Sequence, residues 1–491
     1  MNRLPPECLL NIIRYSNLQD VICLLRTSKH WHSVITSNET IIYQRLAGDY
    51  DSKMGHGPFH HLQDALDTWA SPSARPIKTW KQYCKLQATT EQRWTGKHAP
   101  SYTLDFCGST PTGLVQNIQI DLEKSLLLTT EIGRGGAVDH IVVRCLLDNS
   151  HPTLFTLSMD YDIIHRVELS NGFLVCKSQE KLSVWRWAQD QQRDPVHLEP
   201  APWQTLIYER ATRLADAPHR GELIPILAIP KPNFSLYPLI RFRYPTLCIW
   251  SQMHQPIRFW NFESRSFERS IELNRPDTNS IMIYDRLTCD LVFHFEYDCV
   301  DIGRLYSTLP SLSRGFQDRF EEYVLSHHRD PESTHRDPQI WLDEDRVVEV
   351  YSSPTGNNLV GVMSNGRIFH CPIDLENPGA SKGRISFTRV QTNLWTAAYD
   401  GHKIVAHGPQ GLSIIYLVDQ QQPGTFPAIT MYHAPAFRRR EFEIHDRVEM
   451  TRDTCWLNFR PNQGPWPTTV GMVDFAQEFE GEDETTVVAE S

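Results

Sequence analysis

Apolar residues near the start of the chain recur at the spacing of a helix. Pro5 and Pro6 favour a helix start, because the first residues of a helix need no partner for their amide groups. Leu9, Ile12 and Ile13 then follow within four positions of one another, so that they share one side of a helix. The pattern predicts a short amphipathic first helix.

Polar residues that can cap helices interrupt this pattern three more times. Asp20 is a candidate cap for a second helix, Ser28 for a third, and Ser37 or Asn38 for a fourth. About 45 residues of this kind carry more apolar surface than so small a fold can bury. The surplus predicts docking on the rest of the chain or on a partner protein, and the pattern leaves both open.

The next segment reads as a helical bridge. One or two helical turns are expected over residues 62–69, followed by a break rich in proline and serine at residues 71–76. A second helix is expected to carry Trp80, Tyr83 and Leu86 on one face and to run on towards Trp94. We therefore expect a helical domain at residues 1–48 and a helical linker at residues 49–100.

From residue 102 to about residue 475 the pattern changes to short apolar runs between turn signals, which predict strands. Four segments share a strand, a polar turn and a second strand: residues 174–187, 247–267, 359–374 and 404–419. Units of about 40–50 residues predict a β-propeller over residues 101–476, with about seven blades, or six with long insertions. A pair of β-sandwiches is the alternative. The expected fold class is mainly β with a small α N-terminal domain.

Details of the β region follow from local signals. Asn365-Gly366 is a strong hairpin turn. Residues 102–107 are expected to pair with the last strands, which would close the ring and remove its edges. Residues 189–202, 215–232 and 326–339 read as loops, and residues 477–491 as an acidic disordered tail.

Composition and charge narrow the function. The net charge of −11 argues against generic binding of nucleic acid, which needs cations to neutralise phosphates. The 11 cysteines are scattered and form no CxxC pair, which favours reduced thiols in the cytoplasm or nucleus. No apolar run approaches the length of a membrane span, and we expect no membrane partner.

The search for chemistry gives little. The histidines at positions 60, 61, 327, 328 and 335 lie in polar, proline-rich segments, and the glycines of residues 131–140 are followed by no helix that could hold a phosphate. We expect no metal, no cofactor and no catalytic residue. Arg438, Arg439 and Arg440 could capture a phosphorylated or acidic target, but neighbouring acids favour an ordinary solvated loop.

The N-terminal motif resembles a known family. Leu4-Pro5-x-Glu7-x-Leu9-x-x-Ile12, Asp20-Val21-x-x-Leu24-Leu25 and Ser28-x-x-Trp31 follow the order and spacing of the F-box. The resemblance implies binding to the Skp-type adaptor of cullin-based SCF ubiquitin ligases. The residues expected to bind the adaptor are Leu4, Pro5, Leu9, Ile12, Ile13, Leu18, Val21, Leu24, Leu25 and Trp31. The chain departs from the family at Ser16, where leucine is usual, and at Leu18, where proline is frequent.

The rest of the chain resembles F-box proteins of the fungal type whose second domain is a WD-repeat-like propeller. Arg93-Trp94 resembles the end of their linker helix, and Phe259-Trp260-Asn261 resembles a Trp-Asp repeat ending with Asn in place of Asp. The resemblance implies a non-catalytic substrate receptor, in which the F-box binds the adaptor and, through it, the cullin, and the propeller binds the target. The alternative is a non-degradative scaffold that uses the propeller as an interaction platform.

Overall fold

The structure is a computed structural model of the 491-residue chain. Its described part divides into two compact units: residues 1–236, 240–245 and 441–491, and residues 237–239 and 246–440. The residues described are 4–53, 58–71, 74–95, 101–106, 114–132, 138–148, 150–160, 164–178, 181–195, 199–213, 220–229, 239–250, 256–271, 280–284, 291–296, 347–352, 358–363, 366–372, 386–390, 394, 396–408, 411–416, 428–432, 448–459 and 469–476.

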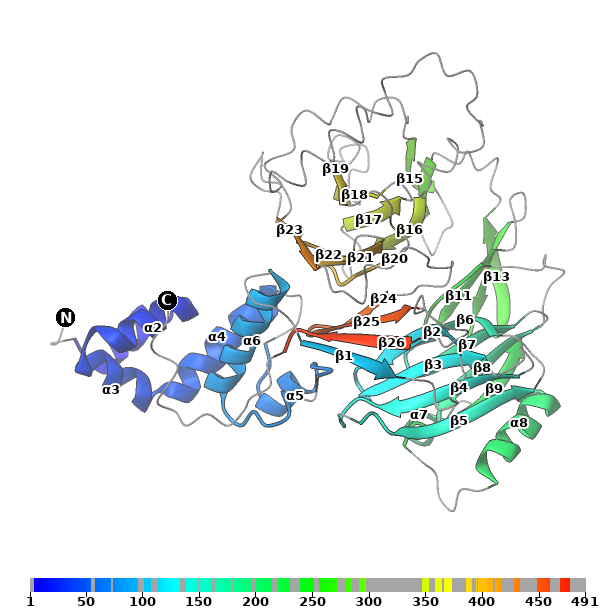
Figure 1. The fold of residues 1–491 in the computed structure, drawn as a ribbon, viewed down its shortest axis with the longest axis horizontal. Helices are drawn as coiled ribbons and strands as arrows, with labels where there is room; N and C mark the ends of the chain where they lie inside the picture. Colours follow the sequence, from blue (N-terminus) through cyan, green and yellow to red (C-terminus); the bar gives the residue numbers. More distant parts are fainter. Residues whose placement is uncertain are drawn as a thin grey trace, which may run out of the picture. The chain divides into compact units, whose positions relative to one another are not determined.

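The first unit begins with the helices that the sequence predicts (Figure 1). They are α1 (Pro6–Ile13), α2 (Leu18–Thr27), α3 (Lys29–Ser37), α4 (Glu39–Lys53), α5 (Leu62–Leu66) and α6 (Trp80–Trp94). Their buried faces form one apolar core that runs from Leu9 in α1 to Leu86 in α6. The helical domain and the bridge therefore share a core, because each short helix has too little surface to bury its own apolar face.

Of the three expected caps, Ser28 is confirmed, because its side chain accepts a hydrogen bond from the Trp31 amide at 3.3 Å. Helix α4 begins after Asn38, as expected, and the Asn38 carbonyl accepts its first helical bond from Ile42 at 3.1 Å. The expected cap Asp20 is wrong. Helix α2 begins two residues earlier than Asp20. Asn17 is its cap, and Asp20 occupies the third helical position of a reciprocal capping box.

The strands at the two ends of the β region pair with each other. Strand β1 (Ser101–Phe106) pairs antiparallel with β26 (Thr469–Asp474), and Ser101 lies opposite Asp474. The sheet continues through β25 (Thr454–Phe459) to β24 (Val448–Met450). This confirms the pairing expected for residues 102–107.

Two more four-stranded sheets belong to the first unit, and each runs in sequence order. The first comprises β2 (Leu114–Asp121), β3 (Leu126–Ile132), β4 (Val138–Cys145) and β5 (Thr153–Asp160). The second comprises β6 (Ile164–Ser170), β7 (Phe173–Ser178), β8 (Leu182–Trp187) and β9 (Leu223–Ile229).

Two of the expected loops are wrong. Residues 189–202 and the segment after them hold α7 (Ala188–Arg193) and α8 (Pro202–Thr212), and residues 215–232 include β9. Helix α8 contacts β5 and β9 (Figure 1). Gln204 in α8 is buried and donates hydrogen bonds to the carbonyls of Val184 and Leu227, at 3.2 and 3.1 Å. The remaining expected loop, residues 326–339, lies outside the described residues.

The remaining strands form four further sheets, whose orders are β10-β11-β12-β13, β14-β15, β16-β17-β18-β19 and β20-β21-β22-β23. Their strands are β10 (Leu239–Arg243), β11 (Thr246–Trp250), β12 (Ile257–Asn261), β13 (Ser266–Ile271), β14 (Ser280–Tyr284), β15 (Leu291–Glu296), β16 (Val347–Ser352), β17 (Asn358–Met363), β18 (Arg367–Pro372), β19 (Ser386–Arg389), β20 (Thr396–Tyr399), β21 (Lys403–Gly408), β22 (Gly411–Tyr416) and β23 (Ala428–Tyr432).

All four predicted strand–turn–strand segments are confirmed as antiparallel hairpins: β7–β8, β11–β12, β17–β18 and β21–β22. Gly366, in the turn between β17 and β18, has φ of +81°, a conformation that glycine adopts at no steric cost. The described β region is thus made of antiparallel sheets, mostly with four strands. Among the described helices, none has the length and apolar character needed to cross a membrane.

Candidate functional site

Helix α1 presents apolar side chains on two opposite faces. Leu9 and Ile13 face inward and are 0% and 1% exposed. Leu4 just before the helix, Ile12 within it and Tyr15 just after it remain 40%, 43% and 89% exposed. Leu4 and Tyr15 lie just beyond the two ends of the helix, and Ile12 lies within it. We call these exposed side chains along α1 and at its ends the apolar stripe.

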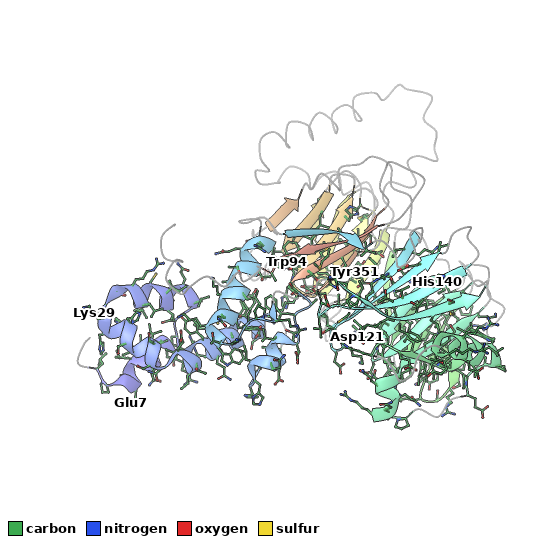
Figure 2. The ribbon with its side chains drawn as sticks, turned by 60° about the horizontal axis from the view of Figure 1, so that its bottom comes forward. Glu7, Lys29, Trp94, Asp121, His140 and Tyr351 are labelled. Atoms are coloured by element: carbon green, nitrogen blue, oxygen red, sulfur yellow. The ribbon has the colours of Figure 1, made fainter. Side chains whose placement is uncertain are left out.

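Helices α2 and α3 divide their apolar residues in the same way. Val21 is fully buried and Trp31 is 7% exposed, so both belong to the core. Leu24 and Leu25 are only partly buried, and they pack against the edge of that core. Glu7 and Lys29 lie at the outer edge of the helical domain in Figure 2. The outer part of the helical domain thus carries charged residues of α1 and α3 as well as the apolar stripe.

The structure sorts the ten residues expected to bind an adaptor into three groups. Three are exposed: Leu4, Pro5 and Ile12. Three are partly buried: Leu18, Leu24 and Leu25. Four are buried in the domain's own core: Leu9, Ile13, Val21 and Trp31. Without a change in helix packing, the buried four have no surface to offer a partner, and they act by holding the helices in place.

Sequence reasoning missed Tyr15, the most exposed large side chain of the stripe. The signal was present, because Tyr15 follows Ile12 by three positions and precedes the break at Ser16. Cys8 is also exposed, and it lies four positions before Ile12. The stripe is therefore longer than the leucine and isoleucine positions alone indicated.

The two departures from the F-box pattern lie in the turn after α1, at Ser16, and at the first residue of α2, Leu18. Leu18 packs against the helical core. The Ser16 hydroxyl donates a hydrogen bond to the Ile12 carbonyl at 3.4 Å, and the Ser16 carbonyl accepts a hydrogen bond from Arg45 at 2.8 Å. Polar contacts thus hold the turn at the position where the family places leucine.

A buried charge cluster joins the helices to the sheet that contains β1. Asp51 at the end of α4 is 0% exposed and forms an ion pair with Arg452. Gln87 donates to the same carboxylate at 2.8 Å, and the Tyr83 hydroxyl lies 3.3 Å from it. The Arg452 guanidinium also lies over the Trp69 ring, 4.6 Å from its centroid. Side chains from α4, from α6 and from Trp69 thus gather around the ion pair of Asp51 with Arg452, which lies between β24 and β25.

The end of α6 makes a second attachment to this sheet. The Trp94 ring stacks on Phe475 with centroids 3.5 Å apart, and its indole nitrogen donates to the Arg452 carbonyl at 3.0 Å. Arg93 donates to the Ala476 carbonyl at 2.5 Å. The Arg93-Trp94 pair therefore anchors the bridge helix to the residues directly after β26 and to the turn between β24 and β25.

Two buried carboxylates complete the attachment. Asp453 accepts the backbone amides of Ala70 and Ser71 at 3.1 and 2.7 Å, and Asp474 accepts the Ser71 hydroxyl at 2.7 Å. Burial, followed by the negative charge of Asp453, raises the pKa of Asp474 to about 7. Burial also raises the pKa of Asp453. A proton on Asp474 relieves the repulsion between the two groups.

The candidate metal and target-binding residues of the β region and the bridge receive no support from the described residues. In the described part of the chain, no group of three or more His, Cys, Asp or Glu side chains is placed to hold a metal ion. His60 and His61 are both exposed. Arg438, Arg439 and Arg440, the candidate target-binding residues, lie outside the described residues, as do His327, His328 and His335. The helical surface is the best-defined candidate site, and it is suited to protein binding.

Comparison with known proteins bears on this surface. Residues 1–43 match the model of the F-box domain. No curated protein matches the chain. Among solved structures, the chain is similar to "KlHsv2 with loop 6CD replaced by a Gly-Ser linker", with 7% identity, a TM-score of 0.40, and coverage of 72% of this chain and 90% of that chain. Residues 1–43 are therefore an F-box domain, which implies a role in binding the adaptor of SCF-type ubiquitin ligases.

Proposed function

We propose that the protein is a non-catalytic substrate receptor of an SCF-type ubiquitin ligase. The observation that carries the proposal is an F-box domain at residues 1–43 whose first helix leaves an apolar stripe exposed. Contiguous exposed apolar surface of this kind marks sites of protein association. We assign the stripe to a Skp-type adaptor.

The adaptor surface in this proposal is narrower than the sequence indicated. Its centre is Leu4, Ile12 and Tyr15, and Leu18, Leu24 and Leu25 form its border. Burying what remains exposed of each aliphatic side chain contributes about 1 kcal/mol, and a buried tyrosine contributes more. The core residues Leu9, Val21 and Trp31 act indirectly, because they fix the angles between the helices.

We further propose that the β region forms a propeller of seven blades that binds the target protein. Support comes from seven antiparallel sheets among the described residues, most with four strands in sequence order. The pairing of β1 with β26 also supports it, because closing a ring with both chain ends removes exposed strand edges. Arg438, Arg439 and Arg440 remain the predicted target-binding residues.

In this proposal, the bridge helix holds the F-box domain at a fixed position relative to the sheet that contains β1. Arg452, Trp94 and Asp453 attach the helices to the sheet of β1 by contacts that are almost entirely buried. A receptor accelerates transfer by raising the effective concentration of the target near the charged ubiquitin enzyme. A stiff attachment keeps that concentration high, because it limits the orientations that the target can take relative to the ubiquitin enzyme. We place this activity in the cytoplasm or nucleus.

Capture of a purified Skp-type adaptor by the full-length chain tests the proposal. Ile12→Asp places a charge in the centre of the stripe and should abolish capture, because an unpaired buried charge is costly. Leu206→Asp is the matched control, since Leu206 in α8 is 54% exposed and lies outside the F-box domain. Failure of the unaltered chain to capture the adaptor would contradict the proposal.

A second step separates the ligase from a non-degradative scaffold. Both require adaptor capture, but only the receptor should also co-purify with the cullin and support ubiquitylation of a bound target. Partners captured by the chain from cells supply candidate targets, and phosphatase treatment shows whether recognition needs phosphate. Adaptor binding with neither cullin nor ubiquitylation would favour the scaffold.

A further inference from the structure

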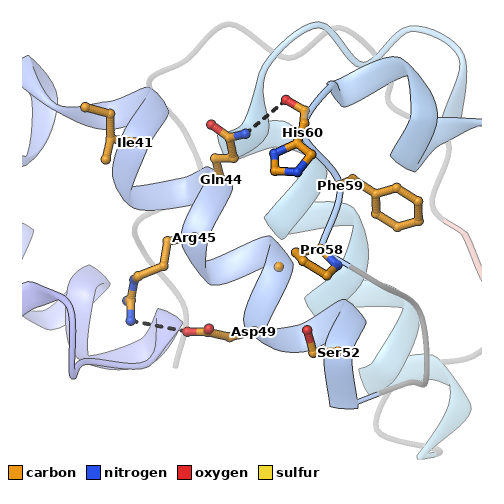
Figure 3. A pocket seen from close by; sticks show the side chains of 9 residues that line it. Ile41, Gln44, Arg45, Asp49, Ser52, Pro58, Phe59 and His60 are labelled. Carbon is orange, nitrogen blue, oxygen red and sulfur yellow. Dashed lines mark hydrogen bonds and ion pairs between the residues drawn. The ribbon is translucent and has the colours of Figure 1, made fainter.

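Arg45 in α4 makes three hydrogen bonds to the end of α1. Its guanidinium donates to the carbonyls of Ile13 at 3.0 Å, of Ser16 at 2.8 Å and of Arg14. It also forms an ion pair with Asp49, one turn further along α4, at 3.2 Å. Figure 3 shows this ion pair beside a shallow cavity of about 310 Å³ that α4 lines together with residues 58–60.

Ile13 is the last residue of α1 and Arg14 is its cap, while Ser16 lies in the turn that follows; the Ile13 carbonyl also accepts the Ser16 amide at 3.0 Å. The last carbonyls of an α-helix have no amide one turn further on, and they carry the negative end of the helix dipole. A guanidinium has five donors in a planar fork, so that one arginine can serve several carbonyls at once. Lysine has one ammonium group and cannot span the same three acceptors.

The turn that Arg45 holds belongs to the exposed stripe. It runs from Arg14, the cap at the end of α1, to Asn17, the cap at the start of α2, and it carries Tyr15. Asn17 within it caps α2 by accepting the Asp20 amide at 2.9 Å. The orientation of Tyr15 and the start of α2 therefore both depend on the conformation of this turn.

We infer that Arg45 is a positioning residue for adaptor binding, which it supports by fixing the turn that presents Tyr15 before the partner arrives. The inference rests on the proposed function. It extends the determinants of adaptor affinity beyond residues 1–43, where the F-box match ends.

The expected effect follows from preorganisation. Ordering the backbone of a free residue costs entropy, and a turn released in the free protein must be ordered again on binding. Loss of Arg45 should therefore weaken adaptor affinity at least about tenfold.

The experiment measures adaptor affinity for four full-length chains: unaltered, Arg45→Met, Arg45→Lys and Asp49→Asn. We expect a loss of at least about tenfold for Arg45→Met, a smaller loss for Arg45→Lys, and less than about twofold for Asp49→Asn, which keeps the three carbonyl contacts. Hydrogen exchange should rise at residues 15–20 in Arg45→Met. Far-UV circular dichroism checks that the helices are retained.

A double-mutant cycle separates positioning from general destabilisation. The double variant Tyr15→Ala, Arg45→Met should lose less adaptor binding free energy than the two single variants lose together, because its turn no longer carries Tyr15. Leu4→Ala combined with Arg45→Met should be additive, since Leu4 lies at the other end of α1. Unchanged affinity in Arg45→Met, or additivity in both cycles, overturns the inference alone. An unaltered chain that binds no adaptor overturns the proposed function, and this inference with it.

Discussion

The ion pair between Asp51 and Arg452 gives the sharpest test of how the helices are attached to the β region. The change Asp51→Asn preserves the size of the side chain and removes its charge. It leaves the Arg452 guanidinium, whose side chain is 5% exposed, without the carboxylate that it contacts. Thr68 remains as a neutral acceptor at 3.2 Å, and the Trp69 ring remains beneath the cation.

The expected cost is large because the pair is buried. Removing one partner of a buried ion pair destabilises proteins by about 3–5 kcal/mol, chiefly because the remaining charge is left desolvated. The double change Asp51→Asn, Arg452→Met removes both charges. It should cost about as much as one single change, because the two groups act on each other. Asp49→Asn, at an exposed pair one turn from Arg45, should change stability by less than about 0.5 kcal/mol.

Urea unfolding followed by tryptophan fluorescence is a suitable assay, since Trp69 and Trp94 are buried at this attachment. We expect the transition that reports on these tryptophans to move to lower urea in Asp51→Asn and hardly to move in Asp49→Asn. A cost below about 1 kcal/mol for Asp51→Asn would refute the reasoning, as would a double variant whose cost equals the sum of the single changes.

Two further predictions concern the buried carboxylates and the second unit. The Asp474 carboxyl has a pKa of about 7 in the folded chain and an ordinary value near 4 when unfolded, so its folded form holds a proton that the unfolded form releases. Its contribution to stability is therefore lost as pH rises through this window. Between about pH 5 and about pH 7, Asp474→Asn should gain more than about 1 kcal/mol of stability relative to the unaltered chain, as measured by urea unfolding at both pH values. A stability difference between the two chains that is the same at both pH values would contradict the account. Gly361→Ala in β17 should cost about 1–3 kcal/mol, because its new methyl carbon would lie 1.7 Å from the ring of buried Phe369; thermal unfolding followed by circular dichroism measures this loss, and a melting temperature equal to that of the unaltered chain would show that the ring moves freely.

The helices could be predicted because their signals are local. Apolar spacing and small polar caps specify a short helix within one or two turns of chain. The error at α2 has the same origin. Asn17 and Asp20 are both good cap residues, and in a capping box each accepts the other's amide. The residue types alone do not say which of the two is the cap.

The strands were predicted unevenly, for a reason visible in their burial. Each confirmed hairpin consists of the second and third strands of a four-stranded sheet. Three of these strands, β7, β8 and β21, are buried at every position. Buried strands read as continuous apolar runs. Outer strands such as β9, with a mixed pattern of burial, carry a weaker signal. Helix α8 was missed because Pro202, at its first position, was read as the end of a loop.

The candidate site could be predicted as a surface but not residue by residue. Ile12 and Ile13 are neighbours of the same type, yet Ile12 faces solvent and Ile13 is buried. Which of them faces outward depends on how α1 packs against the other helices, and this is tertiary information. The pairing of Asp51 with Arg452 spans 401 positions of the chain, so no local pattern could have indicated it.

The binding of a purified Skp-type adaptor to the full-length chain, measured by isothermal titration calorimetry, tests the central claim most directly. The account predicts saturable binding by the unaltered chain, no detectable binding by Ile12→Asp, and unchanged affinity for Leu206→Asp. Binding that survives Ile12→Asp would contradict the assignment of the exposed stripe on α1 as the adaptor surface. Absence of binding by the unaltered chain would contradict the proposed function itself.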